Sequence, residues 1–79
     1  MKTGNLKVRG ILNDVLADDL RKALLALRGV ERASVSQGRV GGAEIEYDEE
    51  SISLEQVVGR LRADGFDAEI GGYSAGHAP

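Results

Sequence analysis

The spacing of apolar residues in this chain alternates between two periods in a fixed order. Runs in which every second residue is apolar indicate half-buried strands, and runs with apolar residues three or four apart indicate amphipathic helices. The strand-type runs predict strands at 4–9, 30–36, 43–48 and 66–70. The helix-type runs predict helices at 14–28 and 53–64. The expected order is therefore strand, helix, strand, strand, helix, strand.

This order predicts an α+β fold of the ferredoxin-like βαββαβ type. In that arrangement a four-stranded antiparallel sheet, with strand order 4-1-3-2, carries both helices on one face. A chain of 79 residues is long enough for one such domain and too short for a second. We expect the domain to span residues 1–70, and the small-residue segment 71–79 to form a disordered tail.

The same strand order makes a prediction about the outer face of the sheet. Lys7 and Arg9 of the first strand would lie between acidic residues of both neighbouring strands. These acidic residues are Glu44 and Glu46 in the third strand and Asp67 and Glu69 in the fourth. Opposite charges that face each other across strands favour a register by about a few tenths of a kcal/mol per pair. The result would be a charged, solvated surface.

Single residues mark where the two helices begin and end. Ser53 and Gln56 fit a capping box, in which the serine hydroxyl accepts from the backbone N–H of Gln56 and the glutamine side chain reaches back to Ser53. Asn13 or Asp14 offers an N-cap oxygen for the first helix. A glycine follows each expected helix and is placed to end it.

The composition excludes several classes of function. The chain contains no cysteine, which excludes disulfides, thiolate metal ligands and thiol catalysis. Its net charge is −3, and we expect no nucleic-acid partner because phosphate binding needs clustered Lys and Arg. No apolar run approaches the roughly 20 residues of a membrane helix, and Met1–Asn5 leads directly into a strand rather than a signal-type apolar segment. We expect a monomer in the cytoplasm that does not contact a membrane.

Several short sequence motifs of this chain occur in the order and spacing that is typical of a known protein family. Gly10 opens the first loop, an Ala-Leu-x-x-Leu-x-Gly-Val phrase occupies 23–30, Tyr47-Asp48 ends the third strand, and Gly65-Phe66 precedes the fourth. Over residues 5–70 the chain resembles the heavy-metal-associated domain, the family of copper chaperones and of the N-terminal modules of metal-pumping ATPases. The resemblance implies a ferredoxin-like fold and a role in metal transport or homeostasis.

The residues that hold the metal in that family differ in this chain. The family loop reads Gly-Met-x-Cys-x-x-Cys, whereas Asn13 and Leu16 stand at the two cysteine positions and Ile11 stands at the methionine position. Two thiolates suit Cu(I) and other soft ions, but a neutral amide and an aliphatic group do not. The resemblance therefore implies a degenerate metal site. We expect no bound cofactor and no tight Cu(I) binding.

A harder metal would need oxygen or histidine ligands. Asp14 and Asp18 stand four residues apart on one face of the expected helix, with Asp19 adjacent, and His77 is the one histidine of the chain. A calcium site wants about six to eight oxygens. Weak metal binding through such non-thiolate ligands, as in a metallochaperone-type protein, is the alternative function. We expect no enzymatic activity, because a single histidine without a thiol leaves no base-and-nucleophile pair.

The first loop is rich in apolar residues that cannot all face one small core. In the family, this loop and the aromatic residue after the second helix are where a partner domain docks. The resemblance implies an interaction surface formed by Ile11, Leu12, Asn13, Asp14 and Phe66. The other interpretation is that two or three of the apolar residues fold inward. On the first interpretation, the chain is a protein-interaction or regulatory module of a metal-homeostasis system.

Overall fold

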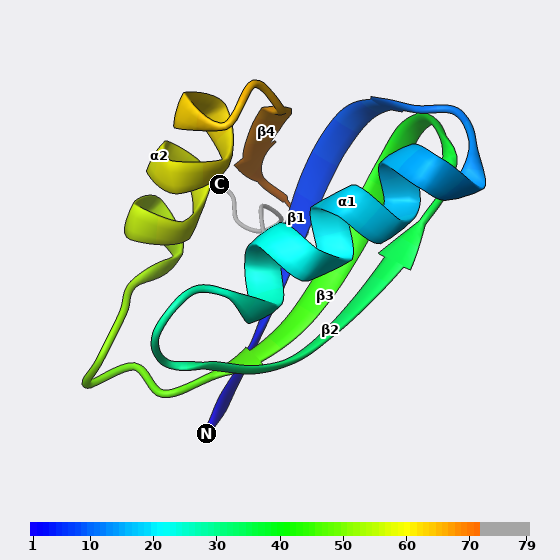
Figure 1. Cartoon of the computed structure of the whole chain (residues 1–79). Helices are drawn as coiled ribbons and strands as arrows, with labels where there is room; N and C mark the ends of the chain where they lie inside the picture. The colour runs from blue at the N-terminus through cyan, green and yellow to red at the C-terminus, as the bar shows by residue number, and fades with distance from the viewer. Residues whose placement is uncertain (72–79) are drawn as a thin grey trace, which may run out of the picture.

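The computed structural model describes residues 1–71. Within this part of the chain the elements follow the expected order (Figure 1). They are β1 (Lys2–Ile11), α1 (Asp14–Leu25), β2 (Val30–Ser36), β3 (Gly38–Tyr47), α2 (Leu54–Ala63) and β4 (Asp67–Ile70). The tail predicted for 71–79 lies outside the described residues, except for Gly71. The N–H of Gly71 donates to the carbonyl of Asn5 at 3.0 Å, so Gly71 is part of the folded domain.

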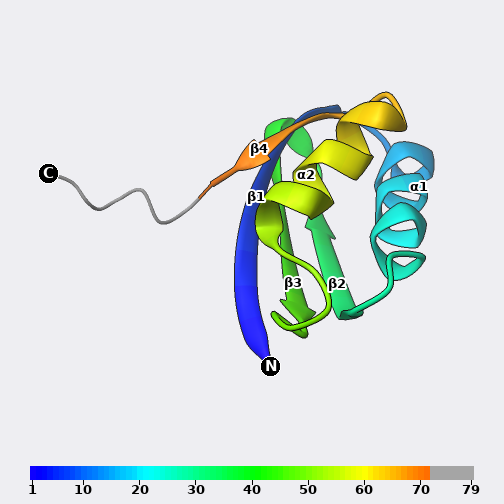
Figure 2. The same cartoon turned by 90° about the vertical axis from the view of Figure 1, so that its left-hand side faces the viewer.

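The four strands form one antiparallel sheet in the order β2-β3-β1-β4. This is the predicted 4-1-3-2 order, seen from the other edge. Both helices lie on the same face of the sheet (Figure 1; Figure 2). The register of the central pair joins Leu6 to Ala43 and Val8 to Gly41. The predicted ferredoxin-like architecture is confirmed.

Burial in the domain follows the two periods read from the sequence. On β1 and β3 alternate residues face the helices, and on each helix one stripe faces the sheet. The buried apolar residues are Leu6, Val8, Ile11, Leu20, Leu24, Val30, Ala43, Ile45, Tyr47, Val57, Val58, Leu61 and Ala68. Among the described residues no other kind of side chain is buried. Apolar contacts therefore stabilise the interior, and any functional group must lie at the surface.

The first helix is shorter than predicted. α1 ends at Leu25 rather than at residue 28. The N–H of Leu27 donates to the carbonyl of Leu24 at 3.1 Å, an i to i−3 bond that tightens the chain and stops the α-helical pattern. Gly29 then takes a positive φ of 98° at the entry to β2, a conformation that glycine adopts without steric cost.

The third strand begins earlier than predicted. β2 and β3 pair with each other only as far as Ser36 and Gly42. Gly38 and Val40 nevertheless pair with β1, so β3 begins at Gly38 rather than at residue 43. A Cβ on Gly41 would stand 2.3 Å from the carbonyl oxygen of Ser36. Only glycine permits this close approach of the two strands.

The outer-face charges are matched as predicted on only one side of β1. Arg9 contacts Glu69 at 2.9 Å and Asp67 at 3.7 Å, both on β4. On the other side the two glutamates of β3 lie opposite the uncharged residues Thr3 and Asn5, so the prediction was wrong there. The exposed Arg9 pairs contribute about 0–1 kcal/mol each, which is too little to set the register.

Two glycines at α2 provide a matched test of these backbone conformations. Gly59 lies inside the helix and Gly65 follows it with a φ of 98°, and a Cβ on either would meet no neighbouring atom within 4 Å. Gly59→Ala is expected to raise the free energy of unfolding by about 0.5–1 kcal/mol, because alanine loses less backbone entropy in a helix. Gly65→Ala is expected to lower it by about 1–2 kcal/mol, because of its left-handed backbone. Urea unfolding followed by circular dichroism measures both changes, and shifts of the same sign would contradict the structure.

Candidate functional site

The first loop joins the end of β1 to the start of α1 at one end of the sheet. Buried residues alternate along β1 through Leu6 and Val8, and the phase changes at Gly10, so that Ile11 is again buried. Gly10 takes a positive φ of 83°, and a Cβ there would meet no atom within 4 Å. Glycine is therefore favoured at this position by its backbone conformation and not by lack of space.

Asn13 caps the first helix. Its backbone is extended, and its Oδ1 accepts a hydrogen bond from the backbone N–H of Leu16 at 2.9 Å. Its carbonyl oxygen accepts from the N–H of Ala17 at 3.1 Å. This is the geometry of an N-cap residue, whose side chain satisfies one of the free N–H groups of the first turn. The amide oxygen that a metal ion would need is thus already bonded to the helix.

The side chains at the family's second cysteine position, Leu16, and at its methionine position, Ile11, have structural roles. Leu16 is partly buried and packs against the core. Ile11 is only 2% exposed. The prediction that Ile11 contributes to an exposed surface is wrong, because the change of phase at Gly10 turns it inward. The second interpretation, in which part of the loop folds inward, applies to these two residues.

Two aliphatic side chains of the loop remain at the surface. Leu12 precedes the cap residue and is 65% exposed, and Val15 in the first helical turn is 69% exposed. We call Leu12 and Val15 the loop patch. Phe66 lies at the same end of the sheet, because the next residue, Asp67, pairs with Arg9 near the end of β1. Phe66 is partly buried against the core and leaves only part of its surface available.

The carboxylates at the start of α1 are bonded to neighbours. Asp14 Oδ1 accepts a hydrogen bond from Gln37 Nε2 of the β2–β3 loop. Asp18 pairs with Lys22 at 3.0 Å and with Arg21 at 3.2 Å. The hydrogen bonds from Lys22 and then Arg21 hold the pKa of Asp18 below its ordinary value. Among the described residues no group of three His, Cys, Asp or Glu side chains is placed to hold a metal ion.

The residues at the family's metal positions do not fit a soft ion. Cu(I) prefers thiolate or thioether ligands, and Leu16 offers only hydrocarbon. Asn13 offers one neutral oxygen that already accepts a hydrogen bond. His77 lies outside the described residues. What these residues can do is fix the start of α1, through the Asn13 cap, and leave the loop patch exposed to a binding partner.

Several solved structures share this fold, including a copper binding domain and a copper transporter domain. A copper binding domain from HMA7, a P-type ATPase, is 25% identical with a TM-score of 0.83, and the match covers 91% of this chain and 96% of that one. Oxidized MerP from Ralstonia metallidurans CH34 is 19% identical with a TM-score of 0.78, over 87% and 94% of the two chains. The yeast copper transporter domain CCC2A is 24% identical with a TM-score of 0.77, over 89% and 94%. The chain matches no protein-family model and no curated protein.

These structural similarities confirm the resemblance to heavy-metal-associated domains that the sequence motifs predicted. The shared part is the scaffold, since the chain carries no cysteine at all. None of the helices in residues 1–71 is long and apolar enough to cross a membrane.

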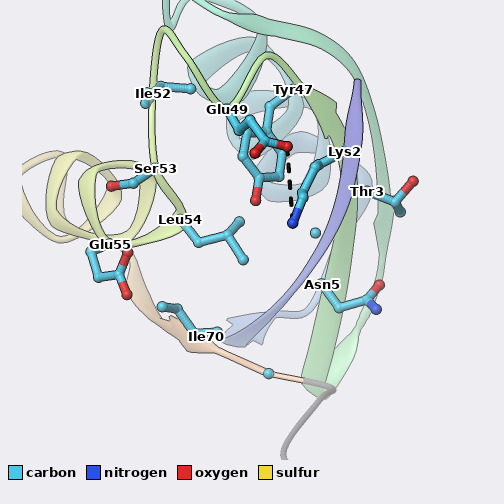
Figure 3. A pocket seen from close by; sticks show the side chains of 12 residues that line it. Lys2, Thr3, Asn5, Tyr47, Glu49, Ile52, Ser53, Leu54, Glu55 and Ile70 are labelled. Carbon is cyan, nitrogen blue, oxygen red and sulfur yellow. Dashed lines mark ion pairs between the residues drawn. The ribbon is translucent and has the colours of Figure 1, made fainter.

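Sequence reasoning missed two features of the surface. The expected contact surface did not include Val15. The signal was available, because Val15 is adjacent to the inward-facing Leu16 and neighbouring helical residues point about 100° apart, so Val15 faces outward. A hollow of about 480 Å³ between the first residues of β1 and the start of α2 was also missed (Figure 3). No local sequence pattern predicts this hollow, because its lining residues lie far apart in the chain, as Lys2, Leu54 and Ile70 do.

The titration of Asp18 tests the ion pairs of α1. Lys22→Gln is expected to raise the pKa of Asp18 toward its ordinary value, and Arg21→Gln is expected to raise it less, because the Lys22 bond has the larger effect. Carbon-13 NMR of the carboxyl groups as a function of pH measures both shifts. Since the folded-state pKa is lowered, any stability from these pairs is present above the unfolded-state pKa and is lost as the pH falls through the folded-state value. Lys7→Gln is the control, and a response equal to that of Lys22→Gln would contradict the assignment.

Placing cysteines at both family positions tests whether this scaffold can bind Cu(I) once the two thiolates are present. Asn13→Cys with Leu16→Cys is expected to create tight Cu(I) binding, because it places two soft ligands on the loop and the first helical turn, where the helix dipole favours negative charge. Competition with a Cu(I) chelator under anaerobic conditions measures the affinity. The matched control is Asn13→Ser with Leu16→Ser, which keeps a capping hydroxyl without a thiolate. The parent chain and the serine variant should both bind weaker than the cysteine variant by orders of magnitude, and a parent chain of equal affinity would contradict the account.

Proposed function

We propose that this chain is a protein-interaction or regulatory module of a metal-homeostasis system, with a heavy-metal-associated scaffold whose metal site is degenerate. The observation that carries the proposal is the exposure of Leu12 and Val15 on the loop where both cysteine positions hold structural residues. The copper binding domain of HMA7 and the CopZ metallochaperone share the fold and support the metal-homeostasis context. On this proposal the chain binds a protein partner and does not carry a soft ion.

The loop patch supplies the attractive part of such a contact. Burying an aliphatic side chain stabilises a complex by about 1.5–3 kcal/mol before the costs of association are subtracted. Asn13 and Asp14 lie between Leu12 and Val15, and both are exposed, so they would form the polar part of the surface. Phe66 would contribute the part of its side chain that is not buried, at the same end of the sheet. Ile11 is excluded from the proposed surface by its burial.

The alternative function, weak metal binding through oxygen ligands, has less support. Asp14 and Asp18 are both bonded to neighbouring side chains, and a metal ion would have to displace those bonds. We further propose that the domain is not an enzyme and that it acts as a monomer in the cytoplasm. The exposed loop patch is what the interaction proposal explains and the metal-binding alternative does not.

Titration with a metallochaperone of the same fold tests the interaction proposal. Adding a copper-loaded CopZ-type protein to the nitrogen-15-labelled chain is expected to shift the amide signals of residues 11–16. Leu12→Ser with Val15→Ser is expected to weaken binding by at least about tenfold, because two aliphatic side chains are no longer buried.

The matched control for that titration is Val40→Ser. Val40 is 62% exposed and pairs with Arg9. Because its neighbour Gly41 is buried, the Val40 side chain projects from the face of the sheet that the helices do not cover. This control should leave the affinity unchanged. Absence of any saturable shift, or an equal loss with Val40→Ser, would contradict the proposal.

A further inference from the structure

A second hollow lies on the helix side of the domain, between the residues that follow α1 and one face of α2. The two helices lie side by side over the same face of the sheet (Figure 2). Gln56, Gly59, Arg60 and Ala63 line the hollow from α2, at the spacing of residues that share one helix face. Its volume is about 460 Å³, within the range of about 300–1,000 Å³ typical of binding pockets.

The wall opposite α2 is fixed by contacts of the backbone. The N–H of Asp48 donates to the carbonyl of Gly29 at 2.8 Å, and a Cβ on Gly29 would stand 2.9 Å from Ser51 Cβ. The Ser51 hydroxyl donates to Asp48 Oδ2 at 3.0 Å. The loop after α1 is therefore held against the loop before α2, and Arg28, which directly precedes Gly29, lines the hollow from this fixed backbone.

The charged residues that line this hollow are all of one sign. Among the described residues they are Arg28 and Arg60, with no acidic residue in the lining. Neither arginine takes part in the ion pairs formed within residues 1–71. Residues 72–79 contain no Asp or Glu, so no side chain of that segment is a carboxylate. The hollow therefore favours an anionic group from another molecule.

The helix dipoles do not account for both arginines. Basic residues in the last turn of a helix complement the partial negative charge of its free carbonyl groups. Lys22 has this position in α1, and Arg28 stands three residues beyond the last residue of α1, Leu25. In α2 the last turn contains Arg62 as well as Arg60. The position of Arg28 at the hollow is thus not explained by the end of its own helix.

We propose that this hollow binds an acidic segment of a partner protein, with an Asp or Glu carboxylate at Arg28 and Arg60. Guanidinium groups bind carboxylates through directed, charge-assisted hydrogen bonds. Leu27 and Ile52 line the same hollow and are partly buried against the core, so an aliphatic side chain next to the carboxylate packs on them. The free carbonyl groups at the end of α1 disfavour a doubly charged phosphate more than a singly charged carboxylate.

This site is separate from the loop patch. The loop patch lies at the start of α1 and the hollow lies beyond its end, and a helix of 12 residues is about 18 Å long. The proposal therefore does not depend on the function proposed for the loop patch, and the two surfaces give shifts at different amides.

A blocked six-residue peptide of alternating Glu and Leu is the probe. Added to the nitrogen-15-labelled full chain, it is expected to give saturable shifts of the amide signals of Arg28, Gly59 and Arg60 and of the Nε–H signals of both arginines. A blocked peptide of alternating Lys and Leu should leave these signals unchanged, because it offers no carboxylate to the two guanidinium groups.

Charge-removing variants separate this site from general attraction between opposite charges. Arg28→Gln and Arg60→Gln are each expected to weaken binding of the Glu-Leu peptide about three- to fivefold, and the double variant about tenfold. The matched control is Arg39→Gln, which removes an exposed arginine of β3 and changes the net charge equally. This control should leave the affinity unchanged.

Several results would overturn the proposal. An equal loss with Arg39→Gln, equal binding of both peptides, or no saturable shift would show that the hollow does not select a carboxylate. Shifts confined to residues 11–16 would place the peptide on the loop patch instead. Tighter binding of inorganic phosphate would assign the hollow to a phosphate group, and shifts at Arg28 and Arg60 that depend on protein concentration without peptide would assign it to a second copy of the chain.

Discussion

The hydrogen bond from the Leu16 N–H to the Asn13 side chain determines what the first loop can do. It fixes the start of α1 directly after β1, and it engages the side-chain oxygen at the first family cysteine position. The second position is filled by Leu16, which packs toward the core. Because a cap and a core residue replace two thiolates, the loop retains the shape of the family scaffold without the ligands that a soft ion requires.

The position of the Asn13 cap also explains why the loop has apolar side chains on its solvent-facing side as well as on its core-facing side. With Ile11 and Leu16 turned inward, Leu12 and Val15 are left on the outer side of the loop. The opposite end of β1 differs, since a hollow lined by Lys2, Glu49 and Glu55 lies there beside the start of α2. The domain thus presents two surfaces of different chemistry at the two ends of one strand, and the sheet between them separates the two.

Local signals predicted the second helix well. Both hydrogen bonds of the capping box form, from Ser53 N–H to Gln56 Oε1 at 2.9 Å and from Gln56 N–H to Ser53 Oγ at 3.2 Å. The limits of β2 and the strand order were also predictable, because hydrophobic period and connection rules act over short distances. Residue type and position limited the cap of the first helix to Asn13 or Asp14, and the structure identifies it as Asn13.

Features that depend on tertiary geometry were not predictable from one sequence. The burial of Ile11 depends on the φ of Gly10, because a glycine with positive φ can shift the alternation of a strand by one residue. The pairing of Glu44 with Asn5 instead of Lys7 depends on where β3 begins. Each of these is a register or a length, which the pattern of apolar residues leaves open.

Hydrogen exchange at the Leu16 amide tests the central claim most directly. If the Asn13 side chain is bonded to the helix, this amide exchanges slowly, and Asn13→Ala accelerates its exchange with little effect on amides in β2. Equimolar Cu(I), added anaerobically, should leave the Leu16 rate of the parent chain unchanged. A Leu16 amide that exchanges freely, or one whose rate changes on adding Cu(I), would contradict the account, because the Asn13 oxygen would then be available as a ligand.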